Sequence, residues 1–394
     1  MARHRVYDEF GVGGYDEQGN IMKKIVIVNQ SSGYLLTDIL NEYAKEYDEV
    51  VQICGTIKEN ERQLDSMIRL DKICAYDRSS AIKRIITWVK GTWQIYRKLK
   101  RDYKDYEIVY VTNPPMAYLC SLHLKNPFSV IVFDTYPDAL SNIGIRKGNP
   151  VFNMWSKWNK KLFAQAKNVF TLSEGMADRL SNYIEREKIT VVPCWSANST
   201  FAPMAKEDNP FIKEHRLKGK FVVMYSGNMG VTHNVQLLVE CAKRLKDNTK
   251  IHFMLIGGGT KKAELEAMVK SEGLTNCTFM DWLPADQLPY SLAAADLGAI
   301  SLTDETALVS VPSKTFNLLA VGCPLMCIVP QNSEIARMVA KYDNGKCFEV
   351  NEVDKMVEFI CQLLMNKELQ KQLSDNSLKA SADFTMENAK MYLK

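Results

Sequence analysis

The sequence predicts an α/β fold of two facing Rossmann-like domains, each built on a parallel sheet, with a cleft between them. Three observations predict this fold class. The chain has 394 residues, which is more than one ordinary hydrophobic core accommodates. Short runs of Val, Ile, Leu and Phe alternate with stretches of helical period, as in parallel sheets covered on both faces. The alternation stops at a polar connector over 198–220 and then starts again.

The first cycle begins at Lys24 and predicts a first domain over residues 24–205. Its strands are expected in the short aliphatic runs 25–29, 50–54, 108–111, 130–133, 169–172 and 189–192. The first strand is followed by a helical period through Leu36, Ile39, Leu40 and Tyr43. Residues 1–23 are expected to be an N-terminal extension. The glycines of that extension are not a phosphate loop, because no hydrophobic strand precedes them.

The second cycle predicts a domain over residues 206–375. Its strands are expected at 221–225, 251–256, 277–280, 297–300 and 324–328. A helix is expected over 234–245, and another is expected to open near Ser313. The remaining residues, 376–394, are predicted to form a C-terminal helix that packs back on the first domain.

The composition is that of a soluble globular protein, with 46% hydrophobic and 24% charged residues. The formal net charge of +4 is too small for a general nucleic-acid-binding protein. The ten cysteines contain no Cys-x-x-Cys pair, so we expect reduced core thiols of a cytoplasmic protein and no metal site. No apolar stretch reaches the roughly 18 residues that a bilayer-spanning helix needs.

Three segments of the second domain follow strands and could bind an anion. The segments are Gly227-Asn228-Met229-Gly230, Gly257-Gly258-Gly259 and Pro312-Ser313-Lys314-Thr315. Small residues at the carboxyl ends of parallel strands let backbone amides approach a phosphate, and Lys314 adds a cation. The alternatives are a tight turn at 257–259 and a helix cap beside a solvated lysine at 313–315. The Walker and dinucleotide fingerprints are both absent, which disfavours an ATPase or a dehydrogenase.

The order of several motifs resembles glycosyltransferase family 4, especially bacterial enzymes that build O-antigen, capsule or exopolysaccharide. The second-domain motifs are 225–230, 279–284, 293–297, 311–314 and 320–324. The first domain contributes the segments 133–138, 172–176 and 192–195. The resemblance covers nearly everything after Lys24 and implies the GT-B fold.

The resemblance implies a nucleotide sugar as co-substrate and no other cofactor. Lys314, Gly230 and the amides of Thr315 and Phe316 would hold the diphosphate, and the Trp282-Leu283 loop would meet the base. Trp282 could equally be a core residue. The remaining candidate donor-binding residues are Gly227, Asn228, His233, Gly257, Gly258, Ser313 and Asn317. No Asp-x-Asp occurs in the chain, so metal-independent chemistry is expected.

One departure from the family concerns two glutamates that many members carry seven residues apart. The matching positions here are Val309 and Asn317. Asn317 can still hydrogen-bond a ribose hydroxyl, whereas the Val309 side chain cannot bind a sugar hydroxyl. Asp304 or Glu305 could supply the missing carboxylate. The identity of the donor sugar therefore stays open.

The resemblance implies that the first domain binds the acceptor. There, Asp134 and Asp138 follow a strand and bracket Tyr136-Pro137. The resemblance implies a retaining transfer, but an inverting enzyme would use one of these aspartates as a general base. A simple turn of Asp and Pro is the alternative. Glu174 and His233 are weaker candidates.

The segment 83–104 interleaves lysines and arginines with large apolar side chains. On a helix, Ile85, Val89, Trp93 and Tyr96 share one face, which predicts binding to an anionic membrane surface. The alternative is an outer helix with a solvated basic rim. A polyprenyl-diphosphate acceptor would require such a membrane surface.

The sequence therefore predicts a peripheral transferase that moves a sugar from a nucleotide donor to a lipid-linked saccharide. Two alternatives stay open: a nucleotide-sugar epimerase of the same fold, and a non-catalytic scaffold in polysaccharide assembly.

Overall fold

The computed structural model describes residues 22–58, 62–77, 79–143, 146–195, 201–303, 307 and 312–394. Three residues with predicted roles, Asp304, Glu305 and Val309, lie outside the described residues. The Gly-rich patch of the extension lies outside them as well. The chain divides into two compact units, Met1–Pro193 with Met386–Lys394, and Cys194–Thr385. The division after Pro193 comes earlier in the chain than the expected boundary at 205.

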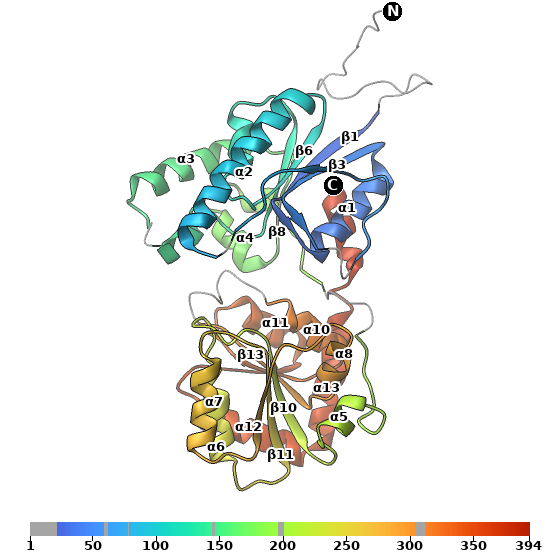
Figure 1. Ribbon diagram of the computed structural model, residues 1–394, viewed down its shortest axis with the longest axis vertical. Helices are drawn as coiled ribbons and strands as arrows, with labels where there is room; N and C mark the ends of the chain where they lie inside the picture. Colours follow the sequence, from blue (N-terminus) through green and yellow to red (C-terminus); the bar gives the residue numbers. More distant parts are fainter. Residues whose placement is uncertain are drawn as a thin grey trace, which may run out of the picture. The chain divides into compact units, whose positions relative to one another are not determined.

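The first unit is built on a seven-stranded parallel sheet (Figure 1), in the order β5-β3-β1-β6-β7-β8-β9. The strands are β1 Lys24–Val28, β3 Glu49–Cys54, β5 Arg69–Lys72, β6 Glu107–Val111, β7 Phe128–Val132, β8 Val169–Thr171 and β9 Ile189–Val191. All six predicted strands are confirmed. The additional strand, β5, lies at the sheet edge, where its polar sequence can face solvent. A short pair, β2 (Ser31–Ser32) and β4 (Thr56–Ile57), accompanies the sheet.

Side-chain caps start several helices of the first unit. The α-helices are α1 Tyr34–Glu46, α2 Ala81–Asp102, α3 Pro150–Gln165 and α4 Glu174–Leu180. Ser80 caps α2, Asn149 caps α3 and Ser173 caps α4, each accepting a bond from a first-turn amide. The 3-10 segments are η1 Ala117–Leu122, η2 Asp138–Ile143, η3 Arg186–Lys188 and η4 Met386–Leu393.

The end of the chain returns to the first unit as η4. The Tyr43 hydroxyl donates to the Tyr392 carbonyl at 2.7 Å, and the Tyr392 ring packs on Phe170. The return agrees with the expectation for 376–394, but the segment is not one helix. Residues 376–381 are the last part of α13 (Lys367–Ser381), which belongs to the second unit.

The second unit holds a six-stranded parallel sheet in the order β12-β11-β10-β13-β14-β15. The strands are β10 Phe221–Ser226, β11 Ile251–Ile256, β12 Cys277–Met280, β13 Leu297–Ser301, β14 Leu325–Ile328 and β15 Gly345–Phe348. The five predicted strands are confirmed. Strand β15 was not predicted, because its sequence Gly-Lys-Cys-Phe contains no aliphatic run.

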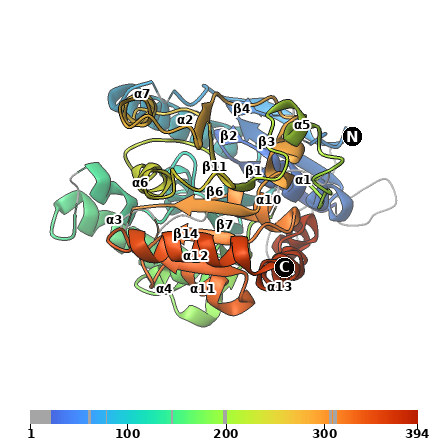
Figure 2. The same ribbon diagram turned by 90° about the horizontal axis from the view of Figure 1, so that it is seen from below.

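Helices lie on both sides of this sheet (Figure 2), and every residue from Phe221 to Tyr225 is buried, which requires cover on both faces. The helices are α5 Pro210–Glu214, α6 Gln236–Arg244, α7 Lys262–Ser271, α8 Leu288–Ala293, α10 Lys314–Ala320, α11 Glu334–Tyr342, α12 Val353–Met365 and α13. The predicted class of two parallel α/β domains is confirmed.

The strand order of the second unit locates its ligand-binding edge. From β10 the chain builds outward through β11 and β12, then crosses back to add β13 on the other side of β10. The order therefore reverses between β10 and β13. In open parallel sheets, ligands bind beyond the carboxyl ends of the strands at such a switch point.

Candidate functional site

A cavity of about 360 Å³ lies at the carboxyl end of β10, at the switch point of the second sheet. Its walls are the loop after β10, the 282–283 loop after β12 and the start of α10. The predicted donor-binding residues that line it are Gly227, Asn228, His233, Trp282, Leu283, Ser313, Lys314 and Asn317. Three segments far apart in the sequence thus contribute to one site, as the motif order predicts.

The two glycine loops pack backbone to backbone beside this cavity. A Cβ on Gly257 would lie 2.1 Å from the carbonyl oxygen of Gly227, and Gly257 has a positive φ of 130°. The Gly227 amide donates to Ile256 at 2.9 Å, and the Gly257 amide donates to Met280 at 3.0 Å. Glycine is therefore required at 257 for the close packing of the loops, which places its main role in architecture.

Lys314 lines the cavity at the start of α10. Its ammonium Nζ is buried and has no hydrogen-bond partner within the described part of the chain. Nζ lies 3.8 Å from the centroid of the Tyr225 ring. Burial lowers the pKa of Lys314 to about 7. A buried ammonium without a counter-ion is costly, which makes this position receptive to an anion.

Tyr225 and Gly227 make room for this lysine. The Tyr225 hydroxyl donates to the Asn228 carbonyl at 2.6 Å, which fixes the ring beneath the ammonium. A Cβ on Gly227 would lie 3.1 Å from Nζ of Lys314. Tyr225 was not predicted as a site residue, because its position in a buried strand does not indicate which side chain its ring contacts.

His233 lies between two cations. Burial first, then the charges of Lys314 and Lys261, lower the pKa of His233 to about 4, so the imidazole is neutral near pH 7. Nζ of Lys261 donates to the His233 carbonyl at 3.3 Å. Lys261 was missed at the sequence level. It lies two residues after the glycine loop 257–259, and a lysine at that place is the signal that could have identified it.

No aspartate or glutamate is among the described residues that line the cavity. The ammonium of Lys314 and the Lys261 side chain beside His233 therefore create a positive potential at the carboxyl edge of the sheet. Such a site favours a ligand with concentrated negative charge, such as a diphosphate.

Trp282 is an exposed cavity wall and not a core residue, since 62% of its surface is accessible. Its ring nitrogen packs near Gly258, where an added Cβ would lie 2.8 Å from Nε1. A large exposed aromatic ring at the rim of a cavity is available to stack on a flat ligand group.

Several predicted donor contacts differ in the structure. The amides of Thr315 and Phe316 donate to the carbonyls of Pro312 and Ser313 at 3.0 and 3.1 Å, so they are not directed at a ligand. The Phe316 ring is buried against Phe384, with 4.9 Å between centroids. α10 thus opens with a tight turn that already uses these two amides, and their role in holding the diphosphate stays a prediction.

Four further glycine and threonine positions lie outside the cavity lining: Gly230, Gly257, Gly258 and Thr315. Gly230 is buried, and an added Cβ there would meet Nδ2 of Asn228 at 2.7 Å. Thr315 is fully buried, and its hydroxyl has no partner among the described residues. These positions support the loops instead of facing the ligand space. Asn317, in contrast, is mostly buried and lines the cavity.

The candidate residues of the first unit lie at the end of β7 and at the start of α4. Asp138 accepts a hydrogen bond from the Tyr183 hydroxyl at 2.6 Å, which gives it a structural partner. Asp134 is exposed, and its amide donates to Oγ1 of Thr112 at 3.1 Å. Glu174 forms an ion pair with Arg186. Asp134 is therefore the more accessible of the two predicted aspartates.

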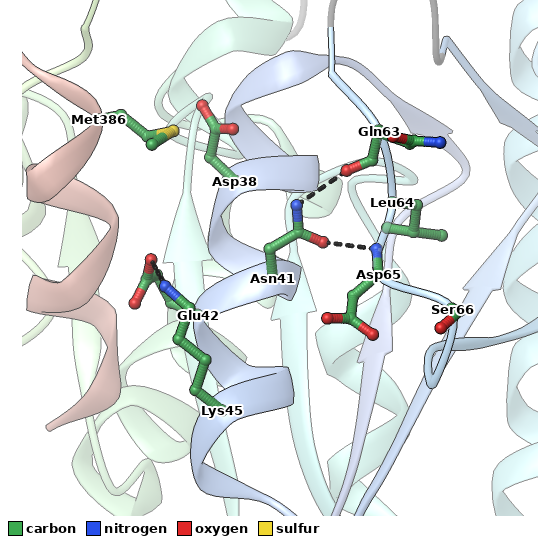
Figure 3. Close-up of a pocket in the computed structure, with 9 residues that line it drawn as sticks. All are labelled: Asp38, Asn41, Glu42, Lys45, Gln63, Leu64, Asp65, Ser66 and Met386. Atoms are coloured by element: carbon green, nitrogen blue, oxygen red, sulfur yellow. Dashed lines mark hydrogen bonds and ion pairs between the residues drawn. The ribbon is translucent and has the colours of Figure 1, made fainter.

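A second polar cavity, of about 510 Å³, lies in the first unit between α1, the segment 63–66 and Met386 (Figure 3). Asp38, Glu42 and Lys45 of its lining are already paired, and Oδ1 of Asp65 accepts from the Met67 amide at 2.9 Å. Asp38 accepts from Arg62 at 3.0 Å, and Glu42 accepts from Lys45 at 2.6 Å. Asn41 bonds the backbone of the 63–66 segment through both ends of its amide. We therefore assign the ligand site to the cavity at β10.

Helix α2 presents an apolar surface to solvent. Gly91, Ile95 and Leu99 pack inward, whereas Ile82 and Trp93 are 72% and 55% exposed. The exposed apolar face consists of Ile82, Ile85, Ile86, Val89 and Trp93. Tyr96, predicted for the same face, is only half-exposed. No helix in the described ranges is long and apolar enough to span a bilayer.

Comparison with known proteins gives matches to sugar-transferring enzymes. Residues 206–380 match the family model for glycosyl transferases group 1. The chain is 27% identical over 235 residues to WcaI of Escherichia coli K12, named as a colanic acid biosynthesis glycosyl transferase, with 58% of each protein covered. It is 21% identical over 239 residues to the Pseudomonas aeruginosa protein WbjE, named as a glycosyltransferase, with 59% of this chain and 60% of WbjE covered. These matches span less than two thirds of either relative.

Solved structures match over almost the whole chain. HepE of Anabaena, in complex with UDP, superposes with a TM-score of 0.71 at 14% identity, covering 94% of this chain and 98% of HepE. WaaG, a glycosyltransferase involved in lipopolysaccharide biosynthesis, superposes with a TM-score of 0.64 at 12% identity, covering 91% and 95%. At these identities the likeness shows the fold.

Proposed function

We propose that this protein transfers a sugar from a nucleotide-sugar donor, because residues 206–380 match the family model for glycosyl transferases group 1 and the chain has the GT-B fold. The acceptor is a polyprenyl-diphosphate-linked saccharide, and the product enters a bacterial surface polysaccharide. The transfer is metal-independent and retains the anomeric configuration. The observation that carries the proposal is the buried ammonium of Lys314 in the cavity at β10, which has no hydrogen-bond partner among the residues that the structure describes.

The cavity at β10 suits the diphosphate of the donor. When the bond between the sugar and the phosphate oxygen breaks, negative charge develops on the leaving nucleoside diphosphate. A buried cation placed at that oxygen stabilises the transition state more than the ground state. Lys314 supplies this cation, and Lys261 lies beside His233 at the same edge. HepE, which has a similar fold, binds UDP.

The base and ribose of the donor fit the remaining walls. The exposed Trp282 ring offers a face for stacking on the base, and Leu283 adds apolar surface. The Asn317 amide can hydrogen-bond a ribose hydroxyl from its place in the lining. Asn317 also stands where many family members carry a glutamate that holds the ribose, so an amide takes the place of a carboxylate at this contact.

The metal-independent character rests on the two lysines. In transferases that use a metal, the ion neutralises the diphosphate as it leaves. Here ammonium groups fulfil that role, so turnover should persist in EDTA. On the acceptor side we assign Asp134 to orient the incoming hydroxyl, because it is exposed whereas Asp138 is only partly exposed.

The proposal of a lipid-linked acceptor is supported by the surface of α2. Its exposed isoleucines, Val89 and Trp93 form an apolar face, and Lys90 and Arg97 border this face without a carboxylate partner within the described residues. An amphipathic helix of this kind binds the interface of an anionic membrane. The protein would therefore act as a peripheral enzyme at the membrane that holds its acceptor.

The direct test is donor turnover with and without a lipid-linked acceptor, over a panel of UDP-, GDP-, ADP- and dTDP-sugars. Release of nucleoside diphosphate that depends on the acceptor supports the proposal. Conversion of the donor sugar without acceptor would identify an epimerase instead. A folded protein with no turnover on any donor would indicate a scaffold.

A further inference from the structure

The second unit contains another cavity, at the opposite end of β10 from the donor site. It measures about 580 Å³ and includes Phe221, the first residue of β10, whereas the donor cavity includes Ser226, the last. Five residue steps along a strand separate the two by about 17 Å. The two cavities therefore lie at opposite ends of the strands of one sheet, and they share no lining residue.

This second cavity is surrounded by lysines. They come from five separate segments and are Lys206, Lys213, Lys218, Lys220, Lys250 and Lys367. The lining contains only two acidic residues, Asp296 and Glu207, which leaves a surplus of four positive charges. We refer to it as the lysine cavity.

Asp296 does not balance the other lysines, because its carboxylate is already in use. Oδ2 accepts from the Val222 amide at 2.7 Å and from Lys206, and Oδ1 accepts from the Gln370 amide group at 2.9 Å. Asp296 is itself mostly buried. Its charge therefore anchors the base of the cavity, and Lys206 is its ionic partner.

The cations at the rim are unpaired. Lys213, Lys218 and Lys250 are exposed, and no ion pair joins any of the three to a carboxylate across the described part of the chain. Like charges held around one cavity repel each other, and this repulsion is relieved when an anion binds between them.

We propose that the lysine cavity binds a compact anion carrying several negative charges, of the diphosphate or triphosphate type, independently of the donor site. The arrangement favours a compact ligand because lysines from five separate segments line one cavity. A flat membrane or an extended polymer would match a plane or a row of cations instead. Flexible lysines that bind as point charges suit phosphate groups of varied orientation.

The test uses inorganic tripolyphosphate as the probe and isothermal calorimetry as the measurement. A triple variant, Lys213→Gln with Lys218→Gln and Lys250→Gln, removes the three exposed rim cations. We expect its affinity for tripolyphosphate to fall at least about tenfold, the effect of losing charge-assisted hydrogen bonds to one ligand. A matched variant, Lys270→Gln with Lys371→Gln and Lys379→Gln, changes the net charge equally at exposed positions outside the cavity. It should bind within twofold of the wild type.

A second arm separates this site from the donor site, so that the inference does not depend on the proposed function. The Lys314→Met protein keeps all three rim lysines. It should therefore bind tripolyphosphate at the lysine cavity with the affinity of the wild type. If tripolyphosphate binding is lost in Lys314→Met and retained in the rim variant, the anion belongs to the donor cavity and the inference is overturned. Equal loss in the rim variant and in the matched control would also overturn it, because only net charge would then matter. Circular dichroism checks that all three variants are folded.

Discussion

The ammonium of Lys314 lies 3.8 Å from the centroid of the Tyr225 ring and has no hydrogen-bond partner among the described residues. The ring quadrupole compensates the buried charge in part, by roughly 2 kcal/mol for a desolvated pair. The rest of the desolvation cost remains until a ligand supplies negative charge. In the proposed function, the diphosphate of the donor supplies this charge beside Tyr225 and Lys314.

Donor binding should depend on pH through Lys314. Burial lowers its pKa to about 7 in the free protein, and a bound diphosphate raises it again. Above pH 7 the lysine must take up a proton on binding, so the affinity for nucleoside diphosphate should fall by up to about tenfold per pH unit. Calorimetry at pH 8.5 in buffers of different ionisation enthalpy should show proton uptake. In Lys314→Met, the contribution of Lys314 to proton uptake is absent, so the binding enthalpy should depend less on the buffer.

The same pKa affects the stability of the free protein. The pKa of Lys314 is lower in the folded state than in the unfolded chain, so the unfolded chain binds more protons between about pH 7 and pH 10.5. Stability should therefore rise with pH across that window because of this residue. Thermal unfolding of the wild type should show the rise relative to Lys314→Met. Parallel curves for the two proteins would mean that the ammonium is solvated.

His233 should contribute to acid sensitivity. Its pKa of about 4 lies below that of an unfolded histidine, so the unfolded chain binds more protons between about pH 6.5 and pH 4. Stability is therefore lost as pH falls through that window. His233→Gln should lose less thermal stability than the wild type between pH 7 and pH 4. If the two unfolding profiles fall in parallel, the imidazole does not lie in the cationic environment described.

Gly257→Ala should destabilise the second unit. The new Cβ would lie 2.1 Å from the Gly227 carbonyl oxygen, at a φ of 130° that side chains rarely adopt. We expect a loss of at least about 2 kcal/mol in the free energy of unfolding, measured by denaturant titration. Gly33→Ala is the control, because an added Cβ there meets nothing within 4 Å. Comparable stabilities for the two variants would show that the loops do not pack as described.

Membrane binding should depend on the apolar face of α2. Replacing Ile86 and Trp93 by serine should weaken binding to anionic vesicles by about tenfold or more, because two exposed side chains can no longer insert. Met365→Ser is the control, since Met365 is exposed on α12 of the other unit. Co-sedimentation with and without anionic lipid, at low and high salt, provides the measurement. Wild-type binding that is absent, or insensitive to salt, would remove the membrane assignment.

The architecture was largely predictable because both sheets are parallel and buried. Their strands are continuous aliphatic runs, such as 251–256, and stand out in the sequence. The strands that were missed, β5 and β15, lie at sheet edges, where polar residues replace the aliphatic pattern. The order of strands was not predictable, since it depends on contacts between distant segments.

The site was predictable at the level of loops and less so at the level of atoms. Glycines and the Pro-Ser-Lys segment marked the strand ends that form the cavity. Which groups face the ligand depends on local backbone geometry. The tight turn at the start of α10 uses the amides of Thr315 and Phe316, while the chain path brings Tyr225 and Lys261 to the same edge.

The central claim is that Lys314 stabilises the leaving diphosphate, and Lys314→Ala tests it most directly. On the best donor and lipid acceptor, the rate of nucleoside diphosphate release should fall by about a hundredfold, as for the loss of one charge-stabilising contact in a transition state. Lys270→Ala, an exposed lysine of α7 outside the cavity, should keep the wild-type rate. A Lys314→Ala enzyme that is folded and turns over within twofold of the wild type would contradict the account.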